Sequence, residues 1–511
     1  MLIDVASEPP IRGQVFEADI CIIGGGAAGL TLTRELAKSG LSVITLEGGG
    51  LKESKRSQNI YRGDNTGRRY FKLHRARRRY LGGSTNCWAG LCAKLRPSDF
   101  EKRSWIPHSG WPITNDDLDP YYEKAAQILK IGAFHPQVDV AFGEKEWPKG
   151  PGLRINGFES VFFQMSKPVR LGTMWREGLR GLPNAKVLLN ANVTHLQLTK
   201  TGQAMNTVHC QVFDGVSFKV SAKYFVLACG GIENPRMLLN ARDIMPNGIG
   251  NQHDLVGRYF MEHPHVDRES LWLPGGSVPS LAHYRRRKRA SVKGRIWSYL
   301  RPKAKKLAQE ELLDFSLVLF KRKNIKKEEK KHPLLKVVFE STEFLHQHHE
   351  KSKRVLNAYT FGNPMEQAPN PKSRVFLDPN GEQDELGLIK LNLHWTLSPL
   401  EKKTLRRGHE MLAEAFAQAN YGRVRVTPTL NLDTFPKQTK GGYHHMGTTR
   451  MSDVPQGGVV DKNCKVFGVD NLFIAGSSVF TTSGSANPTF SIIALALRLS
   501  EHLVTLNKVR P

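Results

Sequence analysis

The sequence has few cysteines and no long hydrophobic run, and both shortages restrict the kind of protein it encodes. Its six cysteines are scattered, without a CxxC pair or zinc-like spacing, so we expect reduced, mostly buried thiols and no metal site. Eighteen apolar residues never occur in a row, which argues against a membrane-spanning segment. The opening residues lack the basic and apolar regions of a signal peptide, so we expect a cytoplasmic protein.

Acidic residues are scarce relative to basic ones. Lys and Arg total 74 against 47 Asp and Glu, which gives a net charge of +27. The segment 285–331 alone holds 18 basic and 5 acidic residues. Such a run is usually a solvated surface segment, and the alternative is peripheral contact with anionic lipid headgroups or an acidic partner. No nucleic-acid-binding motif accompanies the charge, so we expect no nucleic acid partner.

The sequence does have enough length and apolar content for a large packed core. With 511 residues, 40% of them hydrophobic, the chain is long enough for two domains or for one nucleotide-binding domain with a large cap.

The N-terminal segment 18–50 contains the pattern of a dinucleotide-binding fold. A strand-length apolar run at 19–23 is followed by GGGAAG, in which Gly24, Gly26 and Gly29 satisfy G-x-G-x-x-G. One glycine permits the tight turn, one the close approach of a pyrophosphate, and one the close packing of helix on strand.

The residues after the glycines complete this pattern. We expect an amphipathic helix over 30–38 and a second strand over 41–46, which ends at Glu47. An acid at this position accepts hydrogen bonds from a ribose and disfavours the 2′-phosphate of NADP. The pattern alone does not separate FAD from NAD, because both contain an ADP half.

The C-terminal end carries a second strand-turn-helix pattern. A buried strand is expected over 471–475, followed by a sharp turn at 476–478 and a loose Thr/Ser/Gly loop. Asn487 then suits a helix cap and Pro488 the first helical position, before the apolar segment 490–499. The positive end of this helix would point toward whatever fills the site.

Two adjacent histidines stand just before this pattern. The stretch KGGYHHMGTTRM, residues 440–451, places His444 and His445 between paired glycines and a Gly-Thr-Thr-Arg run. Glycine and β-branched threonine are poor helix formers, so the stretch is expected to form a turn that holds a ligand or substrate.

Taken together, these blocks resemble the glucose–methanol–choline (GMC) oxidoreductases, in the branch of pyranose oxidase and the large subunits of fructose and gluconate dehydrogenases. The blocks are GGGAAG with Glu47, LGGSTNCWAG (81–90), VLACGGIENPRMLL (226–239), HHMGTTRM (444–451) and NLFIAGSS…ANPTF (471–490), with weaker echoes at 108–122, 256–265 and 366–377.

The resemblance implies an FAD enzyme that oxidises a CH–OH group of a sugar, sugar moiety or polyol to a carbonyl. His445 would take the hydroxyl proton while hydride passes to flavin N5, and Asn487, 42 residues later, would hold the oxygen. His444 would point away and serve structure. The alternatives are His444 as the base, a packing role for His445, and a pure capping role for Asn487.

The resemblance also implies contacts between the cofactor and the glycine motif, the 81–90 block and the C-terminal block. The expected cofactor-binding residues are Gly24, Gly26, Ala28, Gly29, Glu47, Gly82, Gly83, Ser84, Asn86, Cys87, Val193, Gly230, Gly476, Ser477, Pro488 and Thr489. Among these, Asn86 would lie near flavin N5 and Val193 near the adenine.

Attachment of the cofactor depends on the residue before Trp88. Some relatives link FAD through a histidine there, but this chain has Cys87, so a histidyl link is impossible. We expect non-covalent FAD and a buried Cys87 thiol, with a cysteinyl-flavin link as the alternative.

The resulting fold expectation is α/β, with a Rossmann-like FAD-binding domain and a discontinuous α+β substrate domain. The expected FAD-binding parts are 1–130, 185–265 and 441–511, and the substrate-domain parts are 131–184 and 266–440, the latter including 285–331. Within 370–399 two strand-like runs flank a Pro-Asn-Gly turn. Trp395, which follows them, would line the pocket or pack in the core.

Two other classes of function remain open at this level. An NAD-dependent dehydrogenase shares the glycine pattern but has no need of the two C-terminal blocks, and a non-catalytic flavoprotein would be expected to lack the His–Asn pair. The electron acceptor, which could be oxygen, a quinone or a protein carrier, has no marker in the sequence.

Overall fold

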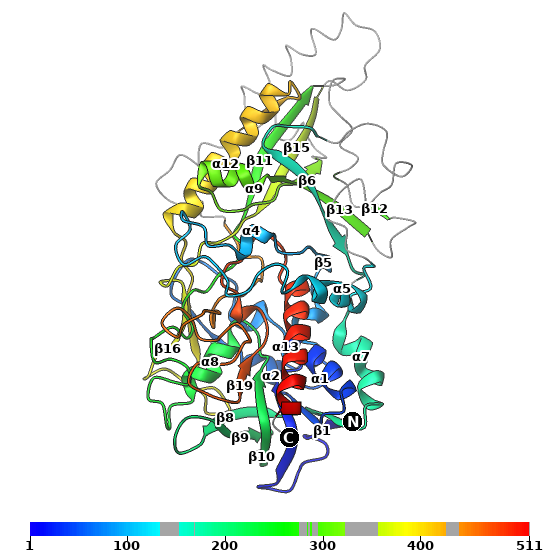
Figure 1. The fold of residues 1–511 in the computed structure, drawn as a ribbon, viewed down its shortest axis with the longest axis vertical. Helices are drawn as coiled ribbons and strands as arrows, with labels where there is room; N and C mark the ends of the chain where they lie inside the picture. The colour runs from blue at the N-terminus through cyan, green and yellow to red at the C-terminus, as the bar shows by residue number, and fades with distance from the viewer. Residues whose placement is uncertain are drawn as a thin grey trace, which may run out of the picture.

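The structure, a computed structural model, describes residues 1–132, 153–167, 169–274, 284, 287–288, 295–321, 356–425 and 439–509. The molecule is elongated, with a large sheet and several helices at one end and a smaller antiparallel sheet with one long helix at the other (Figure 1).

The large sheet combines strands from three distant parts of the chain. Its order is β1 (Leu2–Asp4), β7 (Ala185–Leu189), β3 (Val43–Glu47), β2 (Val15–Ile23), β10 (Ser217–Leu227), β9 (Met205–Gln211) and β8 (Asn192–Leu198), with β19 (Leu472–Ile474) paired to β10. Pairing is parallel from β1 to β10 and between β10 and β19, and antiparallel from β10 to β8. Strand β3 and the last four residues of β2 and of β10 are buried, which accounts for their continuous apolar sequence at the centre of the parallel part.

Helices α1 (Ala27–Lys38), α5 (Asp119–Ile128) and α13 (Thr489–Val509) pack together beside this sheet (Figure 1). The predicted strand, glycine turn, helix and strand are therefore confirmed in order and in register. The helix begins three residues earlier than expected, directly after the glycine turn. Helix α13 is long and apolar enough to cross a membrane, but 56% of its most apolar window is buried within the protein, as in a core helix.

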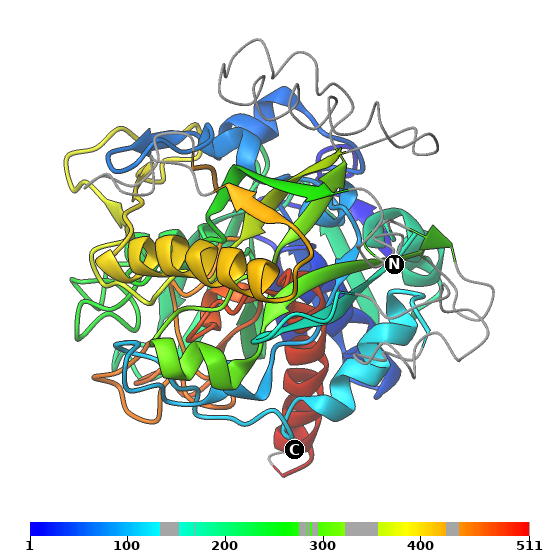
Figure 2. The ribbon, with the colours of Figure 1, turned by 90° about the horizontal axis from the view of Figure 1, so that it is seen from above.

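The sheet at the other end is antiparallel throughout. It consists of β14 (Val318–Lys321), β15 (Leu356–Pro364), β11 (His265–Pro274) and β18 (Arg423–Arg425). Helix α12 (Pro399–Gln418) lies along it (Figures 1 and 2). The helix begins with a capping box between Ser398 and Glu401.

A further sheet joins the two ends of the molecule. It contains β12 (Arg287–Lys288), β13 (Arg295–Pro302), β6 (Phe158–Met165) and β5 (Leu91–Cys92). Strand β13 belongs to the basic segment 285–331, and seven of its eight residues are buried. The interpretation of the whole segment as a solvated surface is therefore wrong for β13. Residues 285–286, 289–294 and 322–331 lie outside the described residues.

The predicted hairpin within 370–399 is confirmed. Strands β16 (Arg374–Leu377) and β17 (Leu391–His394) pair antiparallel, and β4 (Gly63–Asn65) adds to them in parallel. Trp395 is fully buried and donates its indole N–H to Gln367 Oε1 at 3.0 Å. Of the two roles considered for Trp395, the structure shows core packing.

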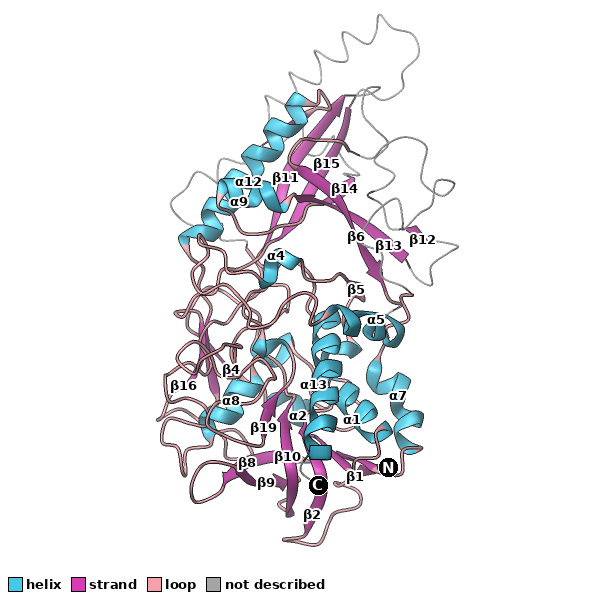
Figure 3. Ribbon diagram, in the orientation of Figure 1, coloured by secondary structure: helices cyan, strands magenta, loops and turns pink. Residues whose placement is uncertain are grey.

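Short elements connect these sheets. They are α2 (Lys55–Asn59), α3 (Leu73–Ala76), the 3-10 turn η1 (Gly83–Asn86), α4 (Pro97–Phe100), α7 (Leu171–Arg180), α8 (Glu233–Asn240), α9 (Ala304–Glu310) and the 3-10 turn η4 (Ser477–Val479). Figure 3 shows helices and strands together at both ends of the molecule, which confirms the α/β class. The exact domain boundaries stay a prediction.

Substitution of Gly29, the third glycine of the motif, tests how closely helix α1 packs against the glycine turn. A Cβ on Gly29 would lie 1.8 Å from the Gly24 carbonyl oxygen, whereas one on Gly26 would meet nothing within 4 Å. We expect Gly29→Ala to destabilise the flavin-free protein by about 1–3 kcal/mol or more, because helix and turn must separate. Gly26→Ala is the matched control and should leave the thermal midpoint unchanged. Equal midpoints for both variants would contradict the packing argument.

Candidate active site

A cavity of about 880 Å³ lies where the glycine turn, the η1 block and the C-terminal segments meet. It reaches from the carboxyl end of β2 to the two adjacent histidines and the first turn of α13. Sheet β2–β10–β19 brings these segments together because strands from both ends of the chain pair with β10.

Most of the predicted site residues line this cavity. They are Gly24, Gly26, Ala28, Glu47, Gly83, Ser84, Cys87, Gly230, His445, Gly476, Ser477, Asn487, Pro488 and Thr489. Val193 lines a second cavity of about 60 Å³, which shares Gly24 and Glu47 with the first.

Gly29, Gly82 and Asn86 line neither cavity. Gly29 contacts the turn itself, as described above. Gly82 has φ +94° and packs against Gly172. The Asn86 amide donates to the Leu81 carbonyl at 2.9 Å. The predicted contact between Asn86 and the flavin is therefore not supported, because its amide is used within its own loop.

The wall near the sheet is bare backbone. Gly24 has φ +110°, and a Cβ there would lie 2.7 Å from the Ala228 carbonyl oxygen. A Cβ on Gly83 would lie 3.2 Å from the Gly26 Cα. The glycines thus let two loops approach each other closely and leave the cavity wall here without side chains, as a close approach of a pyrophosphate requires.

Glu47 is the buried acid of this wall. Its carboxylate accepts the Gly25 N–H at 3.0 Å and the Gly49 N–H at 2.7 Å. Burial raises the pKa of Glu47, while these two hydrogen bonds and the charge of Arg79 oppose the rise. Glu47 is fixed in place at the strand end and lines both cavities, as expected for a residue that contacts a ribose.

At the opposite end, the start of α13 faces the cavity. Pro488, Thr489 and Ile492 all line it. Pro488 directly precedes the helix, and its carbonyl accepts the Ile492 N–H at 2.8 Å. The free N–H groups of this first turn and the helix dipole create a positive potential in the cavity.

The two histidines are arranged differently from the prediction. Asn487 Nδ2 lies 3.1 Å from Nε2 of His444, not of His445. His444 also lines the cavity. The expectation that His444 points away is therefore wrong, and the Asn487 contact favours the alternative in which His444 is the base. The two rings project from adjacent positions of an irregular turn, and that of His444 is the one in contact with Asn487.

His445 belongs to a separate polar cluster. Its Nε2 lies 2.9 Å from the Tyr70 hydroxyl, which in turn donates to the Glu262 carboxylate. Since the single Tyr70 proton goes to Glu262, the His445 Nε2 must donate to Tyr70. Burial lowers the pKa of His445 to about 3. The Nε2 of His445 is thus used as a donor and is not free to accept a proton.

Glu262 anchors both histidines. Besides the Tyr70 hydroxyl, it accepts the backbone N–H groups of Gly442 at 2.8 Å and of His444 at 3.0 Å. Burial raises the pKa of Glu262 to about 7, against the effect of these hydrogen bonds. The carboxylate therefore fixes the backbone from which His444 projects.

The loop between β19 and α13, interpreted from the sequence as loose, is tightly buried. Thr481 to Ser485 are almost fully inaccessible to solvent. The Thr482 hydroxyl accepts the Trp111 indole N–H at 2.8 Å and donates to the Asp99 carbonyl at 2.6 Å. The hydroxyl-rich composition serves to satisfy buried polar groups rather than solvent.

Sequence reasoning missed the residues of the cavity mouth. Phe71, Arg75, Arg78, Lys440 and Tyr443 all line the cavity. The rings of Phe71 and Tyr443 stack with centroids 4.0 Å apart, and Tyr443 is 52% exposed. The only signal was the basic and aromatic run around Phe71 (RRYFKLHRARRR), which lies outside the quoted blocks.

Cys87 is exposed and lines the cavity. The expectation of a buried thiol is wrong at this position, because Cys87 follows the η1 turn at the cavity wall. Of the other cysteines, Cys21, Cys92, Cys210 and Cys464 are buried as expected, and Cys229 is partly buried.

Two family models match the chain. Residues 19–251 match the model described as "FAD dependent oxidoreductase", and residues 369–496 match the one described as "GMC oxidoreductase".

Curated relatives extend over nearly the whole chain. The fructose dehydrogenase large subunit of Gluconobacter japonicus is 24% identical, over 97% of this chain and 99% of that protein. The 2-methyl-1,2-propanediol dehydrogenase of Mycolicibacterium austroafricanum is 25% identical, over 95% of each. The crystal structure of a formate oxidase aligns with a TM-score of 0.59 at 16% identity, over 98% of this chain and all of the other, which shows a shared fold.

The cavity fits FAD on its own chemistry. It offers a glycine cradle for a pyrophosphate, a buried acid at the strand end, and a helix N-terminus at the far end. These features would respectively hold the phosphates, the ribose and the electron-rich edge of the flavin ring. Because no histidine directly precedes Trp88, non-covalent FAD stays our prediction.

Acid precipitation of the purified protein tests this prediction. Unfolding should release the flavin, so the yellow colour should stay in the supernatant. Colour retained in the pellet of the wild-type protein but lost from that of Cys87→Ser would instead demonstrate a cysteinyl link.

Proposed function

The chain belongs to the GMC oxidoreductase family and uses FAD, and on this premise we propose that it oxidises a CH–OH group of a sugar or polyol to a carbonyl, with His444 as the base. The observation that carries this proposal is the 3.1 Å contact between His444 Nε2 and Asn487 Nδ2 in the cavity wall. The other end of the same cavity carries the glycine turn.

The His444 ring is suited to accept a proton. Burial, with the neighbouring His263 as the next cause, lowers the pKa of His444 well below its ordinary value, so the ring is neutral at pH 7. A neutral imidazole in the wall of the cavity is able to take the proton of a substrate hydroxyl. Bound FAD supplies the acceptor for the hydride.

Asn487 orients the reacting oxygen. An amide donates a hydrogen bond without competing for the proton, and Asn487 lies two residues before α13. The helix start keeps the amide beside the His444 ring, so both groups reach the same substrate oxygen. This proximity is the main contribution of the chain to the reaction.

A cyclic or polyhydroxylated substrate agrees with the cavity mouth. The stacked Phe71 and Tyr443 rings offer an apolar aromatic surface for the C–H face of a sugar ring, and Tyr443 directly precedes His444 in sequence. Such surfaces combine an apolar face with polar groups that fix orientation. The relatives named above, a fructose and a diol dehydrogenase, agree with this substrate class.

A cytoplasmic location and a contact of 285–331 with an anionic surface or acidic partner stay predictions. Their support is the composition described above: few cysteines, no disulfide among the six, and the excess of basic residues.

Replacing each histidine separately tests the base assignment. We expect His444→Ala to slow reduction of the bound flavin by substrate about 10²- to 10⁴-fold, the usual loss on removing a general base. His445→Ala should slow it less than about tenfold, because its Nε2 donates to Tyr70. Anaerobic stopped-flow absorbance measures both rates. If His445→Ala slows flavin reduction more than His444→Ala does, with FAD still bound, His445 is the base instead.

The aromatic stack is tested by Tyr443→Ala with Tyr443→Phe as its control. Loss of the ring should raise the KM for a sugar about tenfold and change kcat little, since stacking stabilises bound substrate and transition state alike. The phenylalanine variant keeps the ring and should resemble wild type. A KM unchanged in Tyr443→Ala would exclude the stack from substrate binding.

A further inference from the structure

His444 is linked to a second buried histidine on its far side. His444 Nδ1 lies 2.9 Å from Nδ1 of His263, and the two rings meet edge to face with centroids 4.9 Å apart. His263 is only 1% exposed. Its Nε2 lies 3.3 Å from the Ser483 carbonyl oxygen. The four groups form one continuous row: Asn487, His444, His263 and the Ser483 backbone.

The two ends of this row fix the direction of every hydrogen bond in it. A carbonyl oxygen only accepts, so His263 must carry its proton on Nε2. Burial lowers the pKa of His263 to about 4, so the ring is neutral and its Nδ1 has a lone pair. His444 must then donate from Nδ1 to His263, which leaves His444 Nε2 without a proton.

The opposite end of the row gives the same result. The Asn487 Nδ2 group only donates, so its contact at 3.1 Å requires a lone pair on His444 Nε2. Both ends therefore agree on one tautomer for each ring. All three hydrogen bonds are satisfied together only in this arrangement, and a buried row of this kind resists reversal because reversal would leave a buried polar group without a partner.

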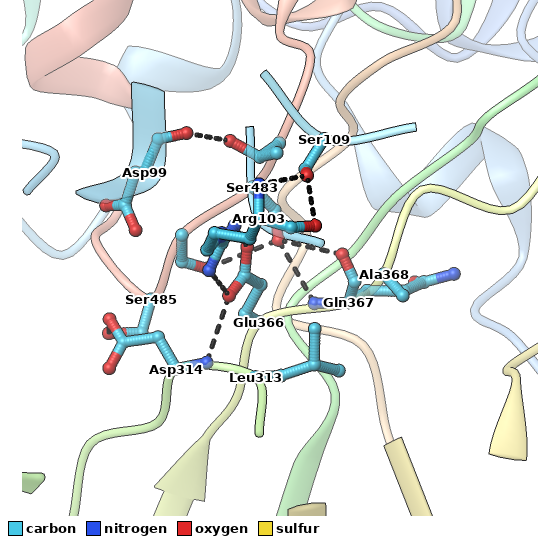
Figure 4. A network of polar contacts seen from close by, with 12 residues as sticks. Asp99, Arg103, Ser109, Leu313, Asp314, Glu366, Gln367, Ala368, Ser483 and Ser485 are labelled. Atoms are coloured by element: carbon cyan, nitrogen blue, oxygen red, sulfur yellow. Dashed lines mark hydrogen bonds and ion pairs between the residues drawn. The ribbon is translucent and has the colours of Figure 1, made fainter. Parts of the chain in front are cut away.

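The Ser483 carbonyl is itself held rigidly. The Ser483 hydroxyl accepts the Gln367 N–H at 3.1 Å, and the Ser485 hydroxyl donates to Asp314 at 3.0 Å. Next to Gln367, the Glu366 carboxylate accepts from Arg103 and from the Asp314 N–H, each at 2.9 Å. Figure 4 shows these contacts around the loop. The buried ion pair thus fixes the acceptor at the end of the row.

We propose that His263 is a positioning residue that sets the tautomer of His444, so that Nε2 carries a lone pair, which accepts from Asn487 in this structure and accepts from the substrate hydroxyl once substrate displaces that bond. This inference rests on the proposed base role of His444 for its kinetic consequence, but the tautomer itself does not depend on the substrate. His263 does not touch the cavity and acts only through His444.

Two substitutions separate positioning from packing. In His263→Asn the amide oxygen replaces Nδ1 as acceptor for His444, while the shorter side chain gives up the contact of Nε2 with Ser483. His263→Leu has neither group. We expect kcat for sugar or polyol oxidation to fall at least about tenfold in His263→Leu, with KM within about threefold, because His444 then populates the wrong tautomer. His263→Asn should recover most of kcat.

A matched control comes from another buried histidine. His409 on α12 is 3% exposed, does not line the cavity and bonds to the Leu405 carbonyl. His409→Leu removes a buried ring of the same kind and should lower stability without lowering kcat. A kcat for His263→Leu equal to that of wild type would overturn the proposal, as would equal losses in His263→Leu and His409→Leu.

NMR of the holoenzyme measures the tautomers of His444 and His263 directly. Long-range ¹H–¹⁵N correlation spectra of histidine-labelled protein, assigned with the His444→Asn and His263→Asn variants, distinguish the two neutral forms. We expect the proton of His444 on Nδ1 and that of His263 on Nε2. A proton on His444 Nε2 would overturn the inference even if the variants fail to fold. If no sugar or polyol reduces the flavin, the proposed function fails while this spectrum still decides the tautomer.

Discussion

The contact between His444 and Asn487 is the interaction on which the account of this molecule depends. His444 lies in the turn 440–451, and Asn487 lies 43 residues later, just before α13. The contact exists only because the intervening chain returns to the large sheet through β19 and then enters a fully buried loop. The proposed base and the proposed orienting amide are thereby fixed side by side before any substrate arrives, so binding need not order them.

The buried loop between β19 and α13 contributes both to the candidate active site and to the stability of the fold. Its hydroxyls replace water as partners for buried polar groups, and its carbonyl accepts from His263. The Arg103–Glu366 pair behind it is almost completely buried. Removing one member of such a pair typically costs about 3–5 kcal/mol, because the other charge is left uncompensated. Polar residues that appear remote from the cavity therefore hold the catalytic geometry.

The sequence was sufficient for the fold and for the cofactor end of the site. The G-x-G-x-x-G turn, its flanking strands and Glu47 depend on short-range backbone geometry, which a local pattern records well. It was insufficient for choosing between His444 and His445. Spacing to Asn487 differs by one residue between them, and only the direction of each side chain in irregular backbone decides. The burial of Ser483 and the exposure of Cys87 likewise depend on distant partners.

The most direct test of the central claim is an anaerobic titration of the purified protein with a panel of sugars, cyclic polyols and simple alcohols, followed by visible absorbance. The account predicts a flavin spectrum that bleaches with at least one sugar or polyol and regains its colour when oxygen or another electron acceptor is added. A protein that purifies without flavin and binds none, or a flavin that no CH–OH donor reduces, would contradict it.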